Sequence, residues 1–186
     1  TYREAATSER LNEELDAASR LRNELQLLAQ QDPLTSASNR REFVRVASEH
    51  LEDRGGQPLS MLVIDIDRFK SINDRFGHAT GDASLVWLVE VLRAALRTED
   101  LLARIGGEEF AVLLPGLGHS AATATARRLL AAIEHAGAPD SLPEPLTVSI
   151  GVASAERGDD VGALMARADH DMYAAKRRGG NDVGCT

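Results

Sequence analysis

A short apolar hairpin is the feature that most constrains the fold of this chain. Leu101–Ile105 and Phe110–Leu114 are apolar runs of strand length, and only the four residues Gly106-Gly107-Glu108-Glu109 separate them. A connection this short joins neighbouring antiparallel strands. The sheet therefore contains at least one antiparallel pair, and two carboxylates lie at the tip of the hairpin.

Helices and further strands surround this hairpin in the sequence. Leu59–Ile64 is an unbroken apolar run typical of a central strand, and Leu146–Val152 alternates as a strand does. Asn39, with Glu42 three residues later, and Ser120 are expected to cap helices. Apolar spacing predicts helices over about 39–53, 69–76, 85–96, 120–133 and 161–172. This order predicts an α/β sandwich whose central, mostly antiparallel sheet is flanked by helices.

The first 30 residues are expected to form a separate helix. They contain no Gly or Pro, and the helix should end before Asp32-Pro33, because the residue preceding proline is driven out of helical geometry. Two interpretations remain open: a parallel coiled-coil stalk, or an amphipathic helix folded back on the domain. The seam that favours a stalk runs through Leu11, Leu15, Ala18, Arg22, Leu25 and Ala29. We therefore expect a helix over 1–30 and one domain over 31–186.

Composition excludes several classes of protein. With 43% hydrophobic and 27% charged residues among 186, the chain is typical of globular domains. A net charge of −8 argues against nucleic acid partners and direct membrane contact, and no apolar run is long enough to span a bilayer. Cys185 has no partner for a disulfide, which indicates a reducing, cytoplasmic location. Because the chain begins with Thr, we expect it to be a piece of a longer protein, which is soluble or membrane-tethered.

Acidic residues follow the predicted central strand and mark the hairpin tip. If these strands are neighbours, Asp65 and Glu108 meet at one edge of the sheet, where two ionised carboxylates repel each other. Magnesium commonly binds one or two carboxylates together with substrate phosphates. Asp67 and Glu109 are further candidate ligands. The alternative is a loop of solvated acids.

Nearby residues suit a phosphorylated ligand. Gly106-Gly107 is either a tight turn that needs positive φ or a place where phosphate approaches the backbone. The segment Asp67–Lys70 enters a helix whose first amides are free to bind an anion, and Lys70 adds positive charge. Lys176, near the end of the last helix, is either a second phosphate contact or a partner of the helix dipole.

The ordered set of motifs resembles the GGDEF family of diguanylate cyclases, in its GGEEF form. The resemblance spans residues 32 to 181 and implies the fold shared with nucleotide cyclases and polymerase palm domains. The motifs are Asp32-Pro33-Leu34-Thr35, Asn39-Arg40-Arg41, the run from Asp65 to Asp74, Gly77-His78, Gly81-Asp82, Gly106-Gly107-Glu108-Glu109-Phe110 and Tyr173-Ala174-Ala175-Lys176.

The resemblance implies roles for individual residues. Asp65, Glu108 and the Ile66 carbonyl match ligands of Mg²⁺, or of Mn²⁺ in its place, and Glu109 matches an acid that binds metal or deprotonates the attacking hydroxyl. The remaining matches concern the nucleotide: Asn73 and Asp82 read guanine, Lys70 and Lys176 contact the triphosphate, and the amides around Phe69 cradle it.

The resemblance also implies a reaction and its control. Two GTP molecules become cyclic di-GMP and two pyrophosphates between paired domains, so we expect a homodimer joined by the N-terminal helix below a sensor domain missing from this chain. Arg97 and Asp100 match an RxxD site for inhibition by the product, with Arg104 as a third candidate. The alternative for Arg97 and Asp100 is an ordinary helix-end ion pair.

Two positions depart from the family pattern. Gly180 replaces the usual arginine of the last motif, which removes a phosphate contact unless Arg177 or Arg178 substitutes, and Ser36-Ala37 replaces Gly-Leu in a connecting turn. The competing hypothesis is a catalytically silent domain that binds GTP or cyclic di-GMP. A cyclase or polymerase acting on another base is disfavoured by Asp82.

Overall fold

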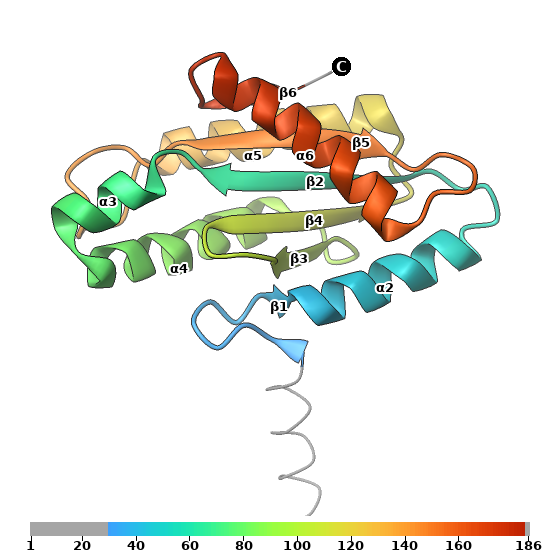
Figure 1. Cartoon of the computed structure of the whole chain (residues 1–186), viewed down its shortest axis with the longest axis horizontal. Coiled ribbons are helices and arrows are strands. Elements are labelled where there is room, and N and C mark those ends of the chain that lie inside the picture. Colours follow the sequence, from blue (N-terminus) through green and yellow to red (C-terminus); the bar gives the residue numbers. More distant parts are fainter. Residues whose placement is uncertain (1–29, 185–186) are drawn as a thin grey trace, which may run out of the picture.

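The computed structural model describes residues 30–184, so almost all of the expected N-terminal helix and Cys185 lie outside the described residues. Figure 1 shows one sheet with helices packed against it. The elements are β1 Ser38–Asn39, α2 Arg40–Asp53, β2 Leu59–Ile66, α3 Phe69–Phe76, α4 His78–Ala95, β3 Leu101–Arg104, β4 Glu109–Pro115, α5 His119–Ala136, β5 Val148–Ser154, α6 Val161–Arg177 and β6 Asp182–Gly184.

The described strands form one mixed sheet in the order β1-β3-β4-β2-β5-β6. The three inner pairings, β3 with β4, β4 with β2 and β2 with β5, are antiparallel, which confirms the expected hairpin and central sheet. The two edge pairings, β1 with β3 and β5 with β6, are parallel and were not anticipated. Both edge strands have three residues or fewer, too short to show any periodicity.

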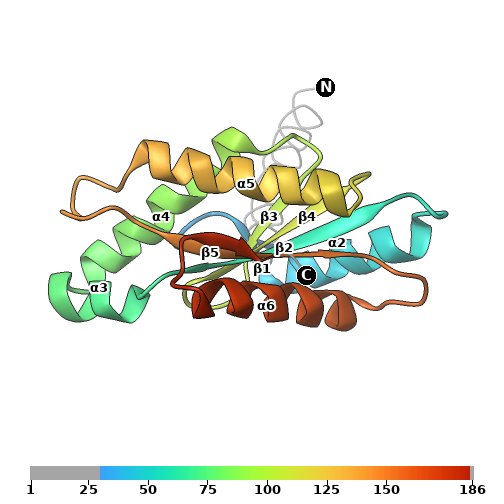
Figure 2. The same cartoon turned by 90° about the horizontal axis from the view of Figure 1, so that it is seen from above.

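Helices cover both faces of the sheet. Figure 2 shows α4 and α5 on one side and α2 and α6 on the other. On β2, Leu62 and Ile64 pack in the cluster that includes α4 and α5 residues, whereas Met61 and Val63 pack in the cluster that includes α2 and α6 residues. Because both faces are buried, residues 61–64 of β2 are continuously apolar rather than alternating.

Helix α6 lies unusually close to the sheet. A Cβ built on Gly151 of β5 would lie 1.8 Å from the carbonyl oxygen of Ala168 in α6, so glycine is required for this contact. The close packing fixes the path of α6 across the sheet and brings its C-terminal end, with Lys176, to the edge where β2 ends.

Local boundaries differ from expectation at two points. β2 continues to Ile66, so Asp65 lies inside the strand rather than after it. The Asn39 side chain accepts a hydrogen bond from the Glu42 amide at 3.0 Å and caps α2 as predicted, but the Ser120 cap is wrong, because α5 begins at His119 after Gly118. Within residues 30–184, no helix combines the length and apolarity needed to cross a membrane.

Candidate active site at the end of the central strands

The pairing of β2 with β4 brings Asp65 to the hairpin that carries the two glutamates. Asp65 lies opposite Glu109 in the antiparallel register. One residue further, the Ile66 amide donates a hydrogen bond to the Glu108 carbonyl at 3.4 Å. Acidic residues more than 40 positions apart in the sequence therefore meet at one end of the sheet.

Asp65 is a buried acid next to a lysine. It is 5% exposed, and its Oδ1 atom has no hydrogen bond of good geometry; the close contact of this atom is Lys176 Nζ at 2.6 Å. Burial raises the pKa of Asp65 to about 6, and the nearby Glu108 and Glu109 add to the rise, while Lys176 opposes it. The site thus makes ionisation of this acid less favourable than for a solvent-exposed carboxyl, and a bound metal cation would offset that cost.

Of the two hairpin glycines, Gly106 is required by the packing of a side chain and not by a left-handed backbone. Neither Gly106 nor Gly107 has positive φ, so the tight-turn interpretation is wrong. A Cβ at Gly106 would lie 2.3 Å from Glu109 Oε2, whereas nothing lies within 4 Å of a Cβ at Gly107. Gly106 therefore leaves the space that the Glu109 side chain occupies.

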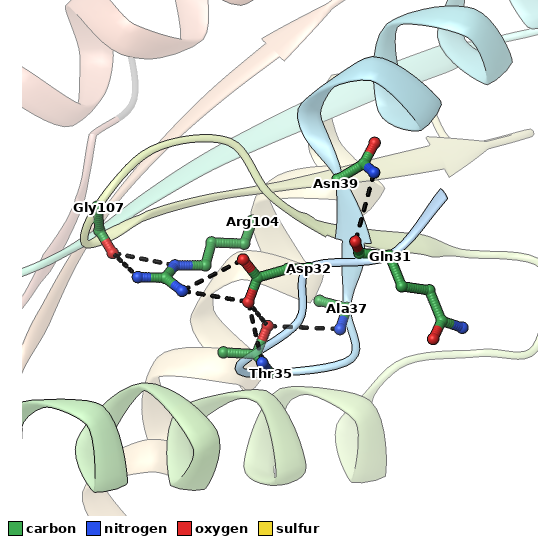
Figure 3. Close-up of polar contacts among 7 residues, drawn as sticks. All are labelled: Gln31, Asp32, Thr35, Ala37, Asn39, Arg104 and Gly107. Atoms are coloured by element: carbon green, nitrogen blue, oxygen red, sulfur yellow. Dashed lines mark hydrogen bonds and ion pairs between the residues drawn. The ribbon is translucent and has the colours of Figure 1, made fainter. Parts of the chain in front are cut away.

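An arginine ties the hairpin to the beginning of the described chain. Arg104 donates two hydrogen bonds to the Gly107 carbonyl, at 2.7 and 3.1 Å, and pairs with Asp32 at 3.1 Å (Figure 3). Thr35 donates to the same Asp32 carboxylate through its amide and its hydroxyl. Partial burial raises the pKa of Asp32, but the bonds from Thr35 and Arg104 outweigh it and hold the pKa below its ordinary value. We call Asp32, Arg104 and Gly107 the hairpin brace.

The residues matched to guanine recognition lie where α3 meets α4. Asn73 is half-buried in α3, and Asp82 is exposed in the first turns of α4. Gly81 directly precedes Asp82 in α4, and a Cβ there would be 2.0 Å from Asn73 Oδ1. The absence of a side chain at Gly81 thus lets Asn73 pack against the turn of α4 that also carries Asp82.

The segment before α3 turns sharply. Arg68 has a left-handed backbone, with φ of 55°, and precedes the first residue of α3, Phe69, whose side chain is buried. Lys70 follows and is exposed. The expected cradle of amides and the lysine therefore lie two to five residues after Asp65, on the same connection.

Comparison with known proteins identifies the family. The sequence model described as "Diguanylate cyclase, GGDEF domain" matches residues 29–182. The chain belongs to the GGDEF family. Diguanylate cyclase TpbB of Pseudomonas aeruginosa is 45% identical over 175 residues, covering 86% of this chain and 38% of that protein. The response regulator PleD of Caulobacter vibrioides is 41% identical over 165 residues, covering 84% and 36%. This GGDEF domain thus spans well under half the length of these curated relatives.

Solved structures share the fold. The coiled coil and GGDEF domain of DgcB from Caulobacter crescentus, in complex with c-di-GMP, superposes with a TM-score of 0.84 at 29% identity, covering 96% of this chain and 98% of that one. The GGDEF domain of TpbB gives 0.76 at 39% identity, covering 83% and 92%. The expected GGDEF fold is confirmed.

The three residues expected in an inhibitory site do not gather at one place in this GGDEF domain. Just before β3, Arg97 pairs with Asp100 at 2.7 Å and also donates to the carbonyl of Pro115, the last residue of β4. Arg104 lies four residues beyond Asp100, a distance of about 13 Å along an extended strand, and its guanidinium belongs to the hairpin brace. The structure therefore separates Arg104 from the Arg97–Asp100 pair.

Two structural roles near the site were not anticipated from the sequence. The brace between Asp32 and Arg104 joins residues 72 positions apart, so no local spacing reveals it. For Gly81 the sequence did carry a signal, because a glycine within a helix indicates that another part of the chain approaches closely.

Proposed function

We propose that this domain is a diguanylate cyclase that joins two GTP molecules into cyclic di-GMP and releases two pyrophosphates in the cytoplasm. The observation that carries the proposal is the buried Asp65, which faces the Glu108–Glu109 hairpin and contacts Lys176. An acid with a raised pKa, surrounded by further acids and one lysine, suits a site for a cation and a polyphosphate.

The oxygen atoms at this edge fit a hard divalent cation. Asp65, Glu108 and the Ile66 carbonyl would hold Mg²⁺ or Mn²⁺, and the buried Oδ1 of Asp65 is an acceptor that lacks a good hydrogen bond. Within residues 30–184, no three His, Cys, Asp or Glu side chains converge enough to hold an ion alone. Triphosphate oxygens would supply the remaining ligands. When bound, the cation would stabilise negative charge on the reacting oxygens.

The other residues of the site bind and orient GTP. Asn73 and Asp82 would read the guanine edge, since a carboxylate accepts from the ring N–H and the amine of guanine but opposes the acceptor nitrogen of adenine. Lys70, Lys176 and the amides around Phe69 would hold the phosphates. Glu109 would accept the proton from the 3′-hydroxyl or contribute to the metal site.

One domain provides half of the reaction. The 3′-oxygen of one GTP attacks the α-phosphorus of the GTP on a partner domain, a P–O bond forms, and pyrophosphate leaves; the second ester forms in the same way. The proposed enzyme is therefore a homodimer, with the segment 1–30 as its dimerisation helix below a sensor domain. Arg97 and Asp100 would bind the product as an inhibitor.

The decisive experiment incubates the protein with GTP and Mg²⁺ and separates the nucleotides. We expect cyclic di-GMP from the wild type and a loss of at least about a hundredfold in Glu108→Gln, which keeps the shape but not the charge. Exposed Glu49→Gln on α2 is the matched control. Undiminished synthesis by Glu108→Gln would refute the role of the hairpin acid.

Gly180 favours a second candidate function, a silent domain that binds GTP or cyclic di-GMP. Residue 180 carries no side chain to contact phosphate, and Arg178 pairs with Asp182 at 2.6 Å. Saturable binding of cyclic di-GMP by a wild-type protein that makes no product would establish this alternative.

A further inference from the structure

Asp67 joins three segments of the chain near the proposed phosphate site. Its Oδ1 accepts a hydrogen bond from the Ser149 hydroxyl of β5 at 2.7 Å. Its Oδ2 accepts from the backbone N–H of Asn181, in the turn after α6, at 2.8 Å. A Cβ at Gly180 would lie 2.8 Å from this carboxylate, so the side chain of Asp67 fills that space. We call Asp67, Ser149 and Asn181 the Asp67 latch.

The turn held by the latch has an unusual backbone. Gly179, Gly180 and Asn181 have consecutive positive φ values of 121°, 77° and 50°. Glycine and asparagine are among the few residues that adopt this conformation as single residues. Such a turn requires external contacts to hold one geometry, and the Asp67 carboxylate supplies a charge-assisted hydrogen bond to it.

The same turn is bonded to the last turn of α6, which carries Lys176. The Gly180 amide donates to the Ala175 carbonyl at 3.3 Å, and the Gly179 amide donates to the Lys176 carbonyl at 3.1 Å. Lys176 in turn contacts Asp65, which lies in β2 two residues before Asp67. A closed chain of contacts therefore runs from Asp67 through the turn to Lys176 and back to Asp65.

A cavity of about 370 Å³ lies beside the latch. Its walls include Asp67, Arg68, Ser71, Gly179 and Asn181, which come from the segment before α3, from α3 and from the turn after α6. The two segments that the sequence associates with phosphate binding are thus adjacent here, and the latch is a direct hydrogen-bonded link between them.

We propose that Asp67 is a positioning residue that fastens the turn after α6 to the β2–α3 connection and so fixes where Lys176 meets the nucleotide phosphates. The inference rests on the proposed GTP site. It also explains why glycine stands at position 180: the carboxylate of Asp67 occupies the space that a side chain there would need. With no arginine at position 180, the orientation of Lys176 matters more for phosphate binding.

The latch predicts a different outcome from metal binding by Asp67. In Asp67→Asn, the amide oxygen accepts from the Asn181 N–H, and the amide nitrogen donates to Ser149 Oγ, because a hydroxyl oxygen also accepts hydrogen bonds. A latch therefore survives this change. A metal ligand does not, since it needs the charged carboxylate. Asp67→Ala removes both functions.

The experiment measures binding of a non-hydrolysable GTP analogue with Mg²⁺, together with kcat and KM for GTP, on the full chain. For Asp67→Ala we expect Kd and KM to rise about tenfold and kcat to change less than about threefold, because a misplaced lysine weakens phosphate binding. For Asp67→Asn we expect values within about twofold of the wild type. A loss in Asp67→Asn equal to that in Asp67→Ala would overturn the latch.

A pair of glycine variants tests the latch without touching Asp67. Gly180→Ala places a Cβ against the carboxylate and should reproduce the defect of Asp67→Ala. Gly158→Ala is the matched control, because Gly158 also has positive φ, 89°, but nothing lies within 4 Å of the added Cβ. Wild-type binding by Gly180→Ala would contradict the proposal.

A double-mutant cycle shows whether Asp67 acts through Lys176. In the Lys176→Ala background, Asp67→Ala should weaken GTP binding by less than about twofold, because the residue it positions is gone. If the fold-losses of GTP affinity from Asp67→Ala and Lys176→Ala multiply in the double variant, Asp67 does not act through Lys176. If the wild type binds no GTP analogue, the proposed function fails, and the Asp67 latch is then tested by hydrogen exchange. Exchange of the backbone amides in residues 176–184 should accelerate in Asp67→Ala but not in Asp67→Asn. Unchanged protection in Asp67→Ala would refute it.

Discussion

At the scale of single residues, Asp65 is held in an environment that disfavours its charge. Its pKa is raised by burial to about 6, so between its unfolded value and 6 the folded state binds more protons than the unfolded state, and stability falls as pH rises. Above that range the ionised acid costs the folded state on the order of 1–2 kcal/mol, allowing for solvent at the rim of the site. The same ionised carboxylate that lowers the stability of the folded state is the group that would bind a cation.

Asp65→Asn should therefore stabilise the metal-free protein. We expect a melting temperature higher by a few degrees at about pH 8, a difference that vanishes near about pH 4, where the wild-type acid is neutral as well. Mg²⁺ with GTP should raise the melting temperature of the wild type and not that of the variant. Asp159→Asn is a control with the opposite expectation. The hydrogen bond from Arg167 lowers the pKa of Asp159, so removal of this carboxylate should destabilise the folded protein at neutral pH. A variant less stable than the wild type at high pH would contradict the argument.

Gly81 tests the nucleotide base site at the same scale. In Gly81→Ala the new methyl group displaces Asn73, whose Oδ1 lies where the Cβ would be. We expect KM for GTP to rise about tenfold, as for loss of one hydrogen bond to the base, with the melting temperature nearly unchanged because alanine favours helices. The control is Gly162→Ala in the first turn of α6, which should leave KM unchanged. An unaltered KM in Gly81→Ala would separate Asn73 from GTP recognition.

At the scale of elements, the hairpin brace connects the segment after residue 30 to the tip that carries Glu108. Arg104→Ala leaves the Gly107 carbonyl without its two donors and Asp32 without its cation. We expect kcat to fall about tenfold or more, because small displacements of catalytic groups are costly, with a smaller change in KM. Arg104→Lys should rescue little, since one ammonium cannot reproduce a planar fork that bonds two partners. Arg45→Ala, on the exposed face of α2, is the control. Relief of product inhibition in Arg104→Ala would instead return Arg104 to the inhibitory site.

Arg97 gives a second prediction for an element boundary, the link from α4 to β3. If Arg97 and Asp100 bind cyclic di-GMP, Arg97→Ala should raise the inhibition constant of the product at least about tenfold, as for loss of a charged, bidentate contact. Glu99→Gln removes the ion pair of Glu99 with Arg97, at 3.1 Å, but keeps the guanidinium, so it should leave this constant unchanged. Equal inhibition of Arg97→Ala and the wild type would leave Arg97 with a structural role alone, through its contacts with Asp100, Glu99 and the Pro115 carbonyl.

The elements also show how far sequence reasoning reaches. The hairpin and α3 were predictable because local periodicity and glycine spacing encode them. The meeting of Asp65 with the hairpin was expected only if the two strands were neighbours, and the pairing of β2 with β4 fulfils that condition. The edge strands β1 and β6 were not, because two or three residues carry no periodic signal and pair only through tertiary contacts. The bond between Asp67 and Asn181 spans 114 positions, and the sequence offers no register that pairs them.

At the scale of the whole molecule, a single domain holds one GTP in the proposed reaction, so activity depends on how often two domains meet. A helix that joins two chains raises the effective concentration of the second half-site to the millimolar range without any new contact at the site. The segment 1–28 lies outside the described residues, and its sequence is the candidate for this role.

Deletion of residues 1–28 should therefore make specific activity proportional to protein concentration. We expect a loss of at least about tenfold at submicromolar protein and partial recovery at high concentration, because dimerisation becomes a bimolecular step. Replacing the segment with an unrelated parallel coiled coil should restore activity, and an unrelated monomeric helix should not. The measurement is initial rate against protein concentration, with mass determined in solution. A truncated protein that is fully active, with a specific activity independent of concentration, would show that the catalytic domains associate through their own surfaces, and residues 1–28 would then have another function.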